Sequence, residues 1–349
     1  MPEQAGRPRS GARGRRLAAG TGLALTLVLG TALPASAQAV DPAPPQTRCQ
    51  LTDPRLPEVS GLVEVGDRML VHNDGGDSLD VYVLDSTCAV VTVHSAPVDP
   101  YDPEDLALAV DGTVWLADTG DNTGTRSTVA LLALHADGSS SVFRLAYPDG
   151  PRDVEALLLA PDGTPHLVTK EVLGASAVYR PASPLVEDGT VGLTEVGRVD
   201  LVLTGTPGGP VGRAGQLMVT GGAVSPDERW VALRTYTDAY VWPLTGSDVV
   251  AALAGEPRRV ALPEAAQGEA VSFTSDSAAL VVAGEGLPSD VTVVPLPAAP
   301  ATDAASAGGS VTGLLSADDG PPPVAAAVAA ALVAGVVVWL GGKLVRRRD

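Results

Sequence analysis

The sequence predicts an all-β fold, a β-propeller of five or six four-stranded blades, in residues 47–297. Three observations support this fold class. A unit of roughly fifty residues recurs along the chain, as it does in repeat proteins. Each unit places a tight turn between two short apolar runs, the pattern of a β-hairpin. No amphipathic helical pattern of 10–15 residues, about the length of an ordinary helix, separates these runs.

The recurring unit is most visible in four segments that begin at Glu104, Glu155, Thr220 and Glu269. They read EDLALAVDGTVWLAD, EALLLAPDGTPHLVT, TGGAVSPDERWVALR and EAVSFTSDSAALVVA. Each has an aspartate seven residues after its first residue, in a turn that favours a tight reversal between strands. A fifth, looser copy begins at Glu58. Further β-like segments follow each hairpin, which is typical of propeller blades.

The sequence indicates the number of blades and the closure of the ring less clearly than it indicates the repeat. The step from Glu155 to Thr220 is 65 residues, which fits either a long loop or a degenerate extra blade. No obvious strand follows Leu296 in the last unit, so residues 47–56 are expected to supply its missing outer strand. Such closure removes an open sheet edge. A sandwich of two sheets is the alternative fold.

The hairpins carry a resemblance to known propellers. SPDERWVAL, APDGTPHLV and AVDGTVWLA resemble the hairpins of WD40-like bacterial propellers. HNDGGDSLDVYVLD and DVEALLLAPDGTPHLVTKE are similar to secreted propellers of the gluconolactonase/regucalcin-like class. The resemblance spans about Glu58 to Leu296 and rests on the hairpin pattern, so it supports the fold more than any activity.

In the gluconolactonase/regucalcin-like class, a divalent ion held on the propeller axis by carboxylates and amides does the chemistry. The resemblance therefore implies four metal-ligand candidates, chosen by residue type and blade position: Glu58, Asn73, Asp118 and Asn122. The ion would be Ca2+, which binds carboxylate, amide and carbonyl oxygens, or another divalent cation.

The two ends of the chain predict export and membrane anchoring. Residues 1–39 combine arginines, an apolar stretch and the small-residue segment ASAQA, which together predict a signal peptide; an uncleaved anchor is the alternative. Residues 298–323 have the composition of a flexible linker. Residues 324–342 form an uncharged run that predicts a transmembrane helix, and 343–349 form a basic cytoplasmic stub. The expected location is the cell membrane, with one C-terminal span and an extracellular domain.

The net charge excludes one class of binding partner, and the cysteine content predicts a disulfide. The chain has 41 acidic and 23 basic residues, and the predicted signal peptide and stub hold many of the basic ones. Such an acidic domain repels nucleic acid, which is excluded as a default partner. The 2 cysteines, Cys49 and Cys88, predict one disulfide in an exported domain; two free thiols are the alternative.

Carboxylates at the starts of the innermost strands are the main site candidates. The fold would bring Glu58, Glu104, Glu155 and Glu269 to one mouth of the central channel. Grouped glutamates need a bound cation, basic partners or raised pKa values, and pairing within the structure is the alternative to a bound ion. The candidates for the axial or ligand-binding face are Glu58, Asn73, Asp74, Glu104, Asp105, Asp118, Asp121, Asn122, Glu155, Lys170, Arg234 and Glu269.

The polar cluster Asp118–Asn122 has two interpretations: a structured blade loop in which Arg126 pairs with Asp121, or a ligand-contacting loop. Its Asp-Thr-Gly triplet has no second copy, which aspartic-protease chemistry requires. No histidine follows His166, so the Gly-Asp-Ser-Leu run at 76–79 does not indicate a lipase. No nucleophile–base pair is evident in the sequence.

The first functional hypothesis is a membrane-tethered extracellular propeller that binds a protein or a small molecule on its open face. The alternative is a divalent-metal-dependent hydrolase of the lactonase or phosphoester type, acting through an axial ion. A structural envelope protein without a ligand is a third hypothesis.

Overall fold

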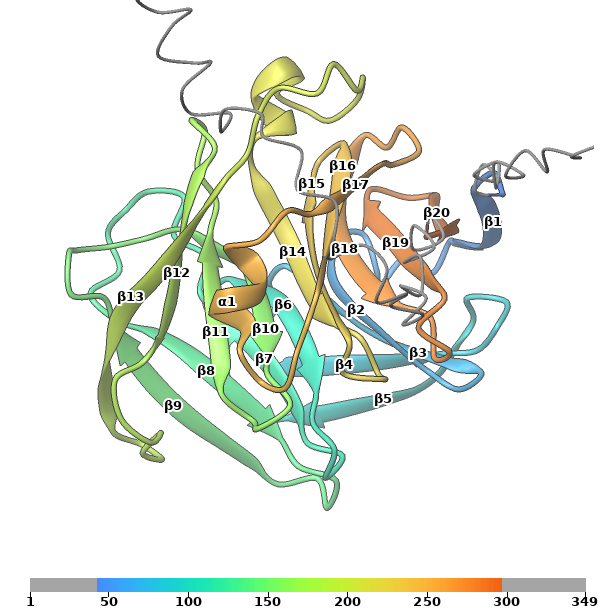
Figure 1. Ribbon diagram of the computed structural model, residues 1–349. Coiled ribbons are helices and arrows are strands. Elements are labelled where there is room, and N and C mark those ends of the chain that lie inside the picture. The colour runs from blue at the N-terminus through green and yellow to red at the C-terminus, as the bar shows by residue number, and fades with distance from the viewer. Residues whose placement is uncertain (1–42, 297–349) are drawn as a thin grey trace, which may run out of the picture. The chain divides into compact units, whose positions relative to one another are not determined.

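The computed structural model describes residues 43–296, which form an all-β domain (Figure 1). Its strands fall into five groups of four. The first three groups are β2 (Val59–Val65), β3 (Arg68–Asn73), β4 (Leu79–Leu84) and β5 (Val90–Ala96); β6 (Pro103–Leu108), β7 (Val114–Asp118), β8 (Val129–Leu134) and β9 (Ser140–Ala146); β10 (Val154–Leu159), β11 (Pro165–Thr169), β12 (Ala175–Pro181) and β13 (Thr190–Asp200).

The fourth and fifth groups complete the ring. They are β14 (Val219–Val224), β15 (Trp230–Thr235), β16 (Asp238–Pro243) and β17 (Arg258–Ala261); β18 (Gln267–Phe273), β19 (Ala279–Glu285), β20 (Ser289–Pro295) and β1 (Gln46–Leu51). We number these groups blades 1 to 5. The first strands of the blades, β2, β6, β10, β14 and β18, contact one another in cyclic order, so the domain is a β-propeller.

Hydrophobic cores lie between the blades. Five clusters of buried apolar side chains each combine residues from two adjacent blades, and together they cover every junction in the ring. The cluster between blades 5 and 1, for example, joins Leu51 and Val281 to Val59 and Leu84. A single blade cannot bury both of its faces alone, so the ring is stabilised by packing between neighbouring sheets.

The recurring aspartate turns form the hairpins between the first two strands of four blades. The turn carboxylates of Asp111 and Asp162 accept the backbone N–H two residues further on, at 2.9 and 3.0 Å. The next residue adopts a positive φ, which glycine tolerates best, as in Gly112 (φ 86°). Glu228 and Ser277 hold the same position with φ of 59°. The repeat predicted from the sequence is therefore a repeat of turn geometry.

The long step before the fourth unit is a loop within the described residues, not a sixth blade. It follows β13 and contains one 3-10 turn, η1 (Gly212–Gln216). The helix α1 (Val249–Leu253) lies between β16 and β17. The sequence did not indicate one further contact: β13 pairs in parallel with β9, which joins blades 2 and 3 into a single eight-stranded sheet.

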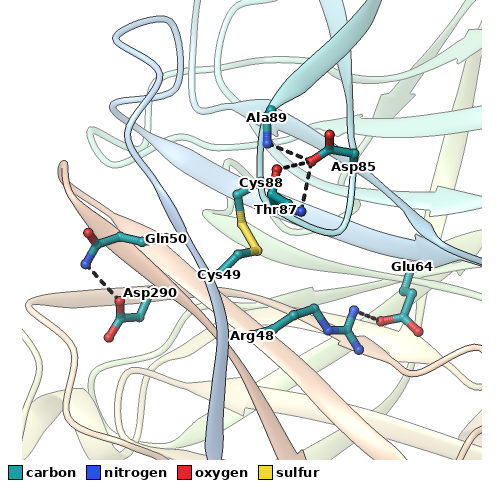
Figure 2. The surroundings of a disulfide bond; sticks show 9 residues. All are labelled: Arg48, Cys49, Gln50, Glu64, Asp85, Thr87, Cys88, Ala89 and Asp290. Carbon is teal, nitrogen blue, oxygen red and sulfur yellow. Dashed lines mark hydrogen bonds and ion pairs between the residues drawn. A yellow bond between two sulfur atoms is a disulfide. The ribbon is translucent and has the colours of Figure 1, made fainter.

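The N-terminal strand closes the ring as predicted. β1 pairs with β20 and supplies the outer strand of blade 5. The disulfide Cys49–Cys88, also predicted, then links β1 to the β4–β5 turn of blade 1 (Figure 2). Arg48 forms an ion pair with Glu64 of β2 beside this disulfide. Two different blades are therefore fastened together where the chain closes on itself.

The predicted C-terminal membrane span is corrected. None of the helices within residues 43–296 has the length and apolar character needed to cross a membrane. A spanning helix needs about 20 residues, whereas α1 has 5. The expected signal peptide (1–39), linker (298–323), span (324–342) and basic stub (343–349) lie outside the described residues.

Candidate cation site at one mouth of the channel

Each innermost strand has a β-bulge close to its first residue. The registers of the five first hairpins shift at equivalent points. A bulge leaves an extra residue outside the ladder and redirects its side chain. The residues at these bulges, which we call the inner ring, are Ser60, Glu104, Glu155, Thr220 and Glu269.

A second set of residues stands two positions earlier in the chain. In blades 2 and 3 these are Asp102 and Asp153, so an Asp-x-Glu pattern occurs twice at equivalent positions. Neither aspartate was among the residues predicted for the site, although this repeated spacing could have identified both. Glu58 holds the same early position in blade 1, and Ser60 holds the inner-ring position that had been assigned to Glu58.

The inner ring is acidic only in part. Ser60 Oγ donates to the carbonyl oxygen of Glu104 at 2.5 Å, and Thr220 Oγ1 donates to that of Gly268 at 3.0 Å. These hydroxyls bind neighbouring innermost strands and carry no charge. The carboxylates of the ring therefore come from blades 2, 3 and 5.

Glu104 lies in two groups of three carboxylates. One group is Asp74, Asp102 and Glu104, and the other is Glu104, Asp153 and Glu155; within each group, one oxygen per residue lies within 4.8 Å of the others. Glu104 is only 4% exposed, and Asp74 reaches the mouth from the β3–β4 loop. Hard divalent cations bind oxygen ligands of this kind.

Charge repulsion marks the first group, Asp74–Asp102–Glu104. Burial, a hydrogen bond with Asp102 and the charges of Asp102, Glu285 and Glu58 raise the pKa of Asp74 to about 8. Burial and the nearby charges of Glu155, Asp74 and Asp102 raise the pKa of Glu104 well above its usual range. No ion pair with a lysine or arginine involves this group within residues 43–296.

Gly120 makes the close approach of these carboxylates possible. It belongs to the polar cluster 118–122, and its N–H donates to the carbonyl oxygen of Asp102 at 3.0 Å. A Cβ added at residue 120 would collide with Glu104 Oε1 and Asp102 Oδ2. Any side chain here would displace both carboxylates. The cluster therefore contributes to the mouth through its glycine, a residue not among the predicted site residues.

The second group has its own counter-ion. Lys170 Nζ lies 2.7 Å from Glu155 Oε1, and both side chains are largely buried. Burial lowers the pKa of Lys170, but the attraction of Glu155 and Glu269 raises it, so that the net shift is upward and the amine stays charged. The ring of Tyr236 lies 5.4 Å from the same Nζ. Lys170 is thus a predicted site residue that the structure places inside the mouth.

Glu269 is the third carboxylate of the inner ring, and unlike Glu155 it has no ion-pair partner within residues 43–296. It is 2% exposed, and its Oε2 has no hydrogen-bond partner among the described residues. Burial raises its pKa to about 7, although Lys170 opposes the shift. Arg234 is not its ion-pair partner, because Arg234 donates to the carbonyl oxygens of Ala270 and Ala283, each at 2.6 Å.

Asp105 has a structural position next to this site. Its carboxylate is fully buried and accepts backbone N–H groups from Leu106 and Leu157 at 2.8 Å and from Gly222 at 3.0 Å. These donors belong to β6, β10 and β14. Asp105 therefore ties three blades together at the axis.

The cluster 118–122 is a structured loop, but its pairing differs from the expectation. Asp121 accepts the backbone N–H groups of Thr125 and Arg126 at 2.9 and 2.8 Å. The guanidinium of Arg126 pairs with Asp118 at 3.0 Å instead. Asp118 Oδ1 also accepts the N–H of Asp102 at 2.9 Å, so it supports the loop that carries a mouth carboxylate.

Asn73 and Asn122 lie outside the carboxylate groups. Asn73 accepts the N–H of Glu58 at 3.3 Å and donates to the carbonyl oxygen of Arg55 at 2.7 Å, while Asn122 is exposed. The carboxylates that the structure brings within 4.8 Å are thus different residues from the four that the resemblance implied as metal ligands.

Comparisons with known proteins support the resemblance but assign no activity. No family model matches the chain, and no curated protein matches it. Among solved structures, a gluconolactonase from Xanthomonas campestris is 17% identical, with 68% of this chain and 72% of that chain covered and a TM-score of 0.40. A putative gluconolactonase has 15% identity, coverage of 65% and 70%, and a TM-score of 0.39.

A streptogramin B lyase is 10% identical, with coverage of 71% and 96% and a TM-score of 0.38. The expected resemblance to gluconolactonase-like propellers is therefore found among solved structures. Identities and TM-scores at this level carry no argument about chemistry, which must come from the residues of the mouth.

Proposed function

We propose that the acidic mouth binds a divalent cation at Asp74, Asp102 and Glu104, and that the loaded mouth binds a small, oxygen-rich ligand. The main support is the geometry of this first carboxylate group, in which Gly120 allows Asp102 and Glu104 to approach closely. Within residues 43–296, no lysine or arginine forms an ion pair with the group. Like charges at this spacing oppose ionisation unless a cation compensates them.

The donor set suits calcium better than a transition metal. All three ligands are carboxylates, and calcium accepts about six to eight oxygens in flexible geometry. Three carboxylates therefore leave coordination positions for backbone or ligand oxygens. Asp74 and Asp102 are half-buried whereas Glu104 is buried, so a ligand hydroxyl, carboxylate or carbonyl would approach the ion from the side of the two aspartates.

A hydrolase is the second candidate function, favoured by Glu269. A bound divalent ion supplies an acidified water and polarises an ester or lactone carbonyl. Glu269 has a pKa of about 7, and its Oε2 has no hydrogen-bond partner within residues 43–296; these are properties of a group that accepts and returns a proton near neutral pH. Lys170, paired with Glu155 and attracted by Glu269, holds these two carboxylates at the mouth.

The disulfide supports an extracellular location, because Cys49–Cys88 closes the ring in the way that secreted domains are usually stabilised. Such a compartment also contains calcium at concentrations that fill modest-affinity sites. We propose export on this basis.

Calorimetric titration of the purified full chain with Ca2+ and Mg2+ tests the binding function. We expect one ion per chain, and at least a tenfold loss of affinity in Glu104→Gln. Glu256→Gln changes an exposed glutamate between α1 and β17 that belongs to neither carboxylate group; it is the matched control and should bind as the wild type does. Unchanged affinity in Glu104→Gln, or no binding in the wild type, would refute the proposal.

Hydrolysis of a lactone panel and a phosphodiester panel then separates binding from catalysis. A hydrolase should show ion-dependent turnover that falls at least a hundredfold in Glu269→Gln while ion binding persists. A binding module should show ion uptake with no turnover in either protein.

A further inference from the structure

The other end of the channel contains a cavity of about 360 Å³. All five innermost strands begin at the acidic mouth and run toward this end. A strand of six residues is about 20 Å long, so the cavity and the mouth are separate places in the domain. The cavity is lined by the last residues of these strands and by the turns that follow them.

The wall of the cavity is mainly apolar. Val63, Leu108, Leu159 and Val224 line it from four different blades. Small side chains such as Ala109 leave the space between them unfilled. Apolar pockets of a few hundred cubic ångströms with a few polar groups are typical small-molecule sites.

The rim of the cavity is negatively charged. Asp111 and Asp162 stand in the turns next to lining residues, and the backbone N–H groups of Thr113 and Thr164 hold the pKa values of these carboxyls below the usual range. Glu228 lines the cavity itself and takes part in none of the ion pairs found within residues 43–296.

Basic side chains near the rim are already paired. Arg229, which follows Glu228, lies 2.7 Å from Asp227, Arg68 lies 3.7 Å from Asp67, and Arg48 pairs with the lining residue Glu64. The rim therefore favours a positively charged group and disfavours an anion, while the wall favours a hydrocarbon body.

We propose that this cavity binds a compact apolar molecule that carries one ammonium group. The hydrocarbon body fills the space beside Leu108, Leu159 and Val224, and the ammonium stays at the rim beside Glu228. This site does not depend on the cation proposed for the mouth, and it contains none of that site's residues.

Three probes with one shared hydrocarbon cage test the proposal: adamantan-1-amine, adamantan-1-ol and adamantane-1-carboxylate. Binding to the full chain is measured by ligand-observed NMR titration with Ca2+ present, so that the mouth is occupied. The amine should bind about two- to fivefold more tightly than the alcohol, the effect of one exposed ion pair, and the carboxylate should bind most weakly. Equal affinities for amine and carboxylate, or no binding of any probe, would overturn the proposal.

Variants locate the site. Ala109→Trp should abolish binding of both amine and alcohol by filling the cavity, and the smaller change Ala109→Leu should weaken it. Ala266→Trp, at an exposed alanine just before β18 and so at the end of the domain where the innermost strands begin, is the control and should leave affinity unchanged. Glu228→Gln should remove the preference for the amine and keep the alcohol. Retained amine binding in folded Ala109→Trp and Ala109→Leu would show that the cavity is not the site.

Discussion

Removal of the disulfide between β1 and blade 1 tests how the ring is held closed. In the variant Cys49→Ala/Cys88→Ala, β1 keeps its pairing with β20, the ion pair Arg48–Glu64 and the hydrogen bond from Gln50 to Asp290 at 3.0 Å. The covalent link across the closing junction is lost, together with the packing of the two sulfur atoms in the core between blades 5 and 1. The expected result is a folded but less stable propeller.

The size of the effect follows from the sequence separation of the two cysteines. They are 39 residues apart, and the loop-entropy model gives roughly 4 kcal/mol for a closed loop of this length. For a domain of this size, about 2–4 °C of Tm corresponds to each kcal/mol, so the melting temperature should fall by roughly 8–16 °C.

The assay is urea unfolding followed by tryptophan fluorescence, with hydrogen exchange as a local measurement. Exchange should rise for the amides of β1 and β20, and much less for β7 and β11, which lie far from the junction. Serine variants of both cysteines serve as a second check on packing. A loss of stability below about 1 kcal/mol, with unchanged exchange in β1, would refute the reasoning.

Three further changes probe the site and the axis. Gly120→Ala should weaken Ca2+ binding at least tenfold by calorimetry, because its Cβ displaces two carboxylates, whereas Gly192→Ala, where nothing lies within 4 Å, should not. Asp105→Asn should cost about 1–3 kcal/mol in urea unfolding, since an amide cannot accept all three N–H groups; equal stability to Asp67→Asn would contradict this. Burial lowers the pKa of His166, so the folded state resists its protonation and the contribution of this residue to stability is lost as pH falls below 6.5. The difference in free energy of unfolding between His166→Gln and the wild type should therefore shift in favour of the variant from pH 7 to 5, and a constant difference would exclude this.

The architecture was largely accessible from the sequence because it depends on local turn chemistry. The aspartate turns recur at blade spacing, and the absence of a strand after Leu296 predicted the role of residues 47–56. The parallel pairing of β9 with β13 could not be predicted from the sequence, because pairing between the outer strands of two blades produces no repeated sequence pattern. The prediction that the membrane is a partner through a single helical span was wrong, because no helix within residues 43–296 is long and apolar enough to cross a membrane.

The site was only partly accessible, because bulges set which residue points inward. Glu58 shares a residue type with Glu104, but the bulge at residue 60 puts Ser60 in the inner ring. Glu104, Glu155, Glu269 and Lys170 were found by repeat position and charge. Gly120 was missed, since its importance lies in a contact with a strand start that precedes it in the chain.

The pairing of β1 with β20 brings Gln46 opposite Val293, so the polypeptide enters and leaves the domain at one point of the circle. The order of the blades in the ring therefore does not depend on which blade the chain enters first. A short peptide joining residues 43 and 296, with new termini opened in the loop between β5 and β6, should give a permuted chain that folds to the same wheel and can be inserted into a host protein as a cassette.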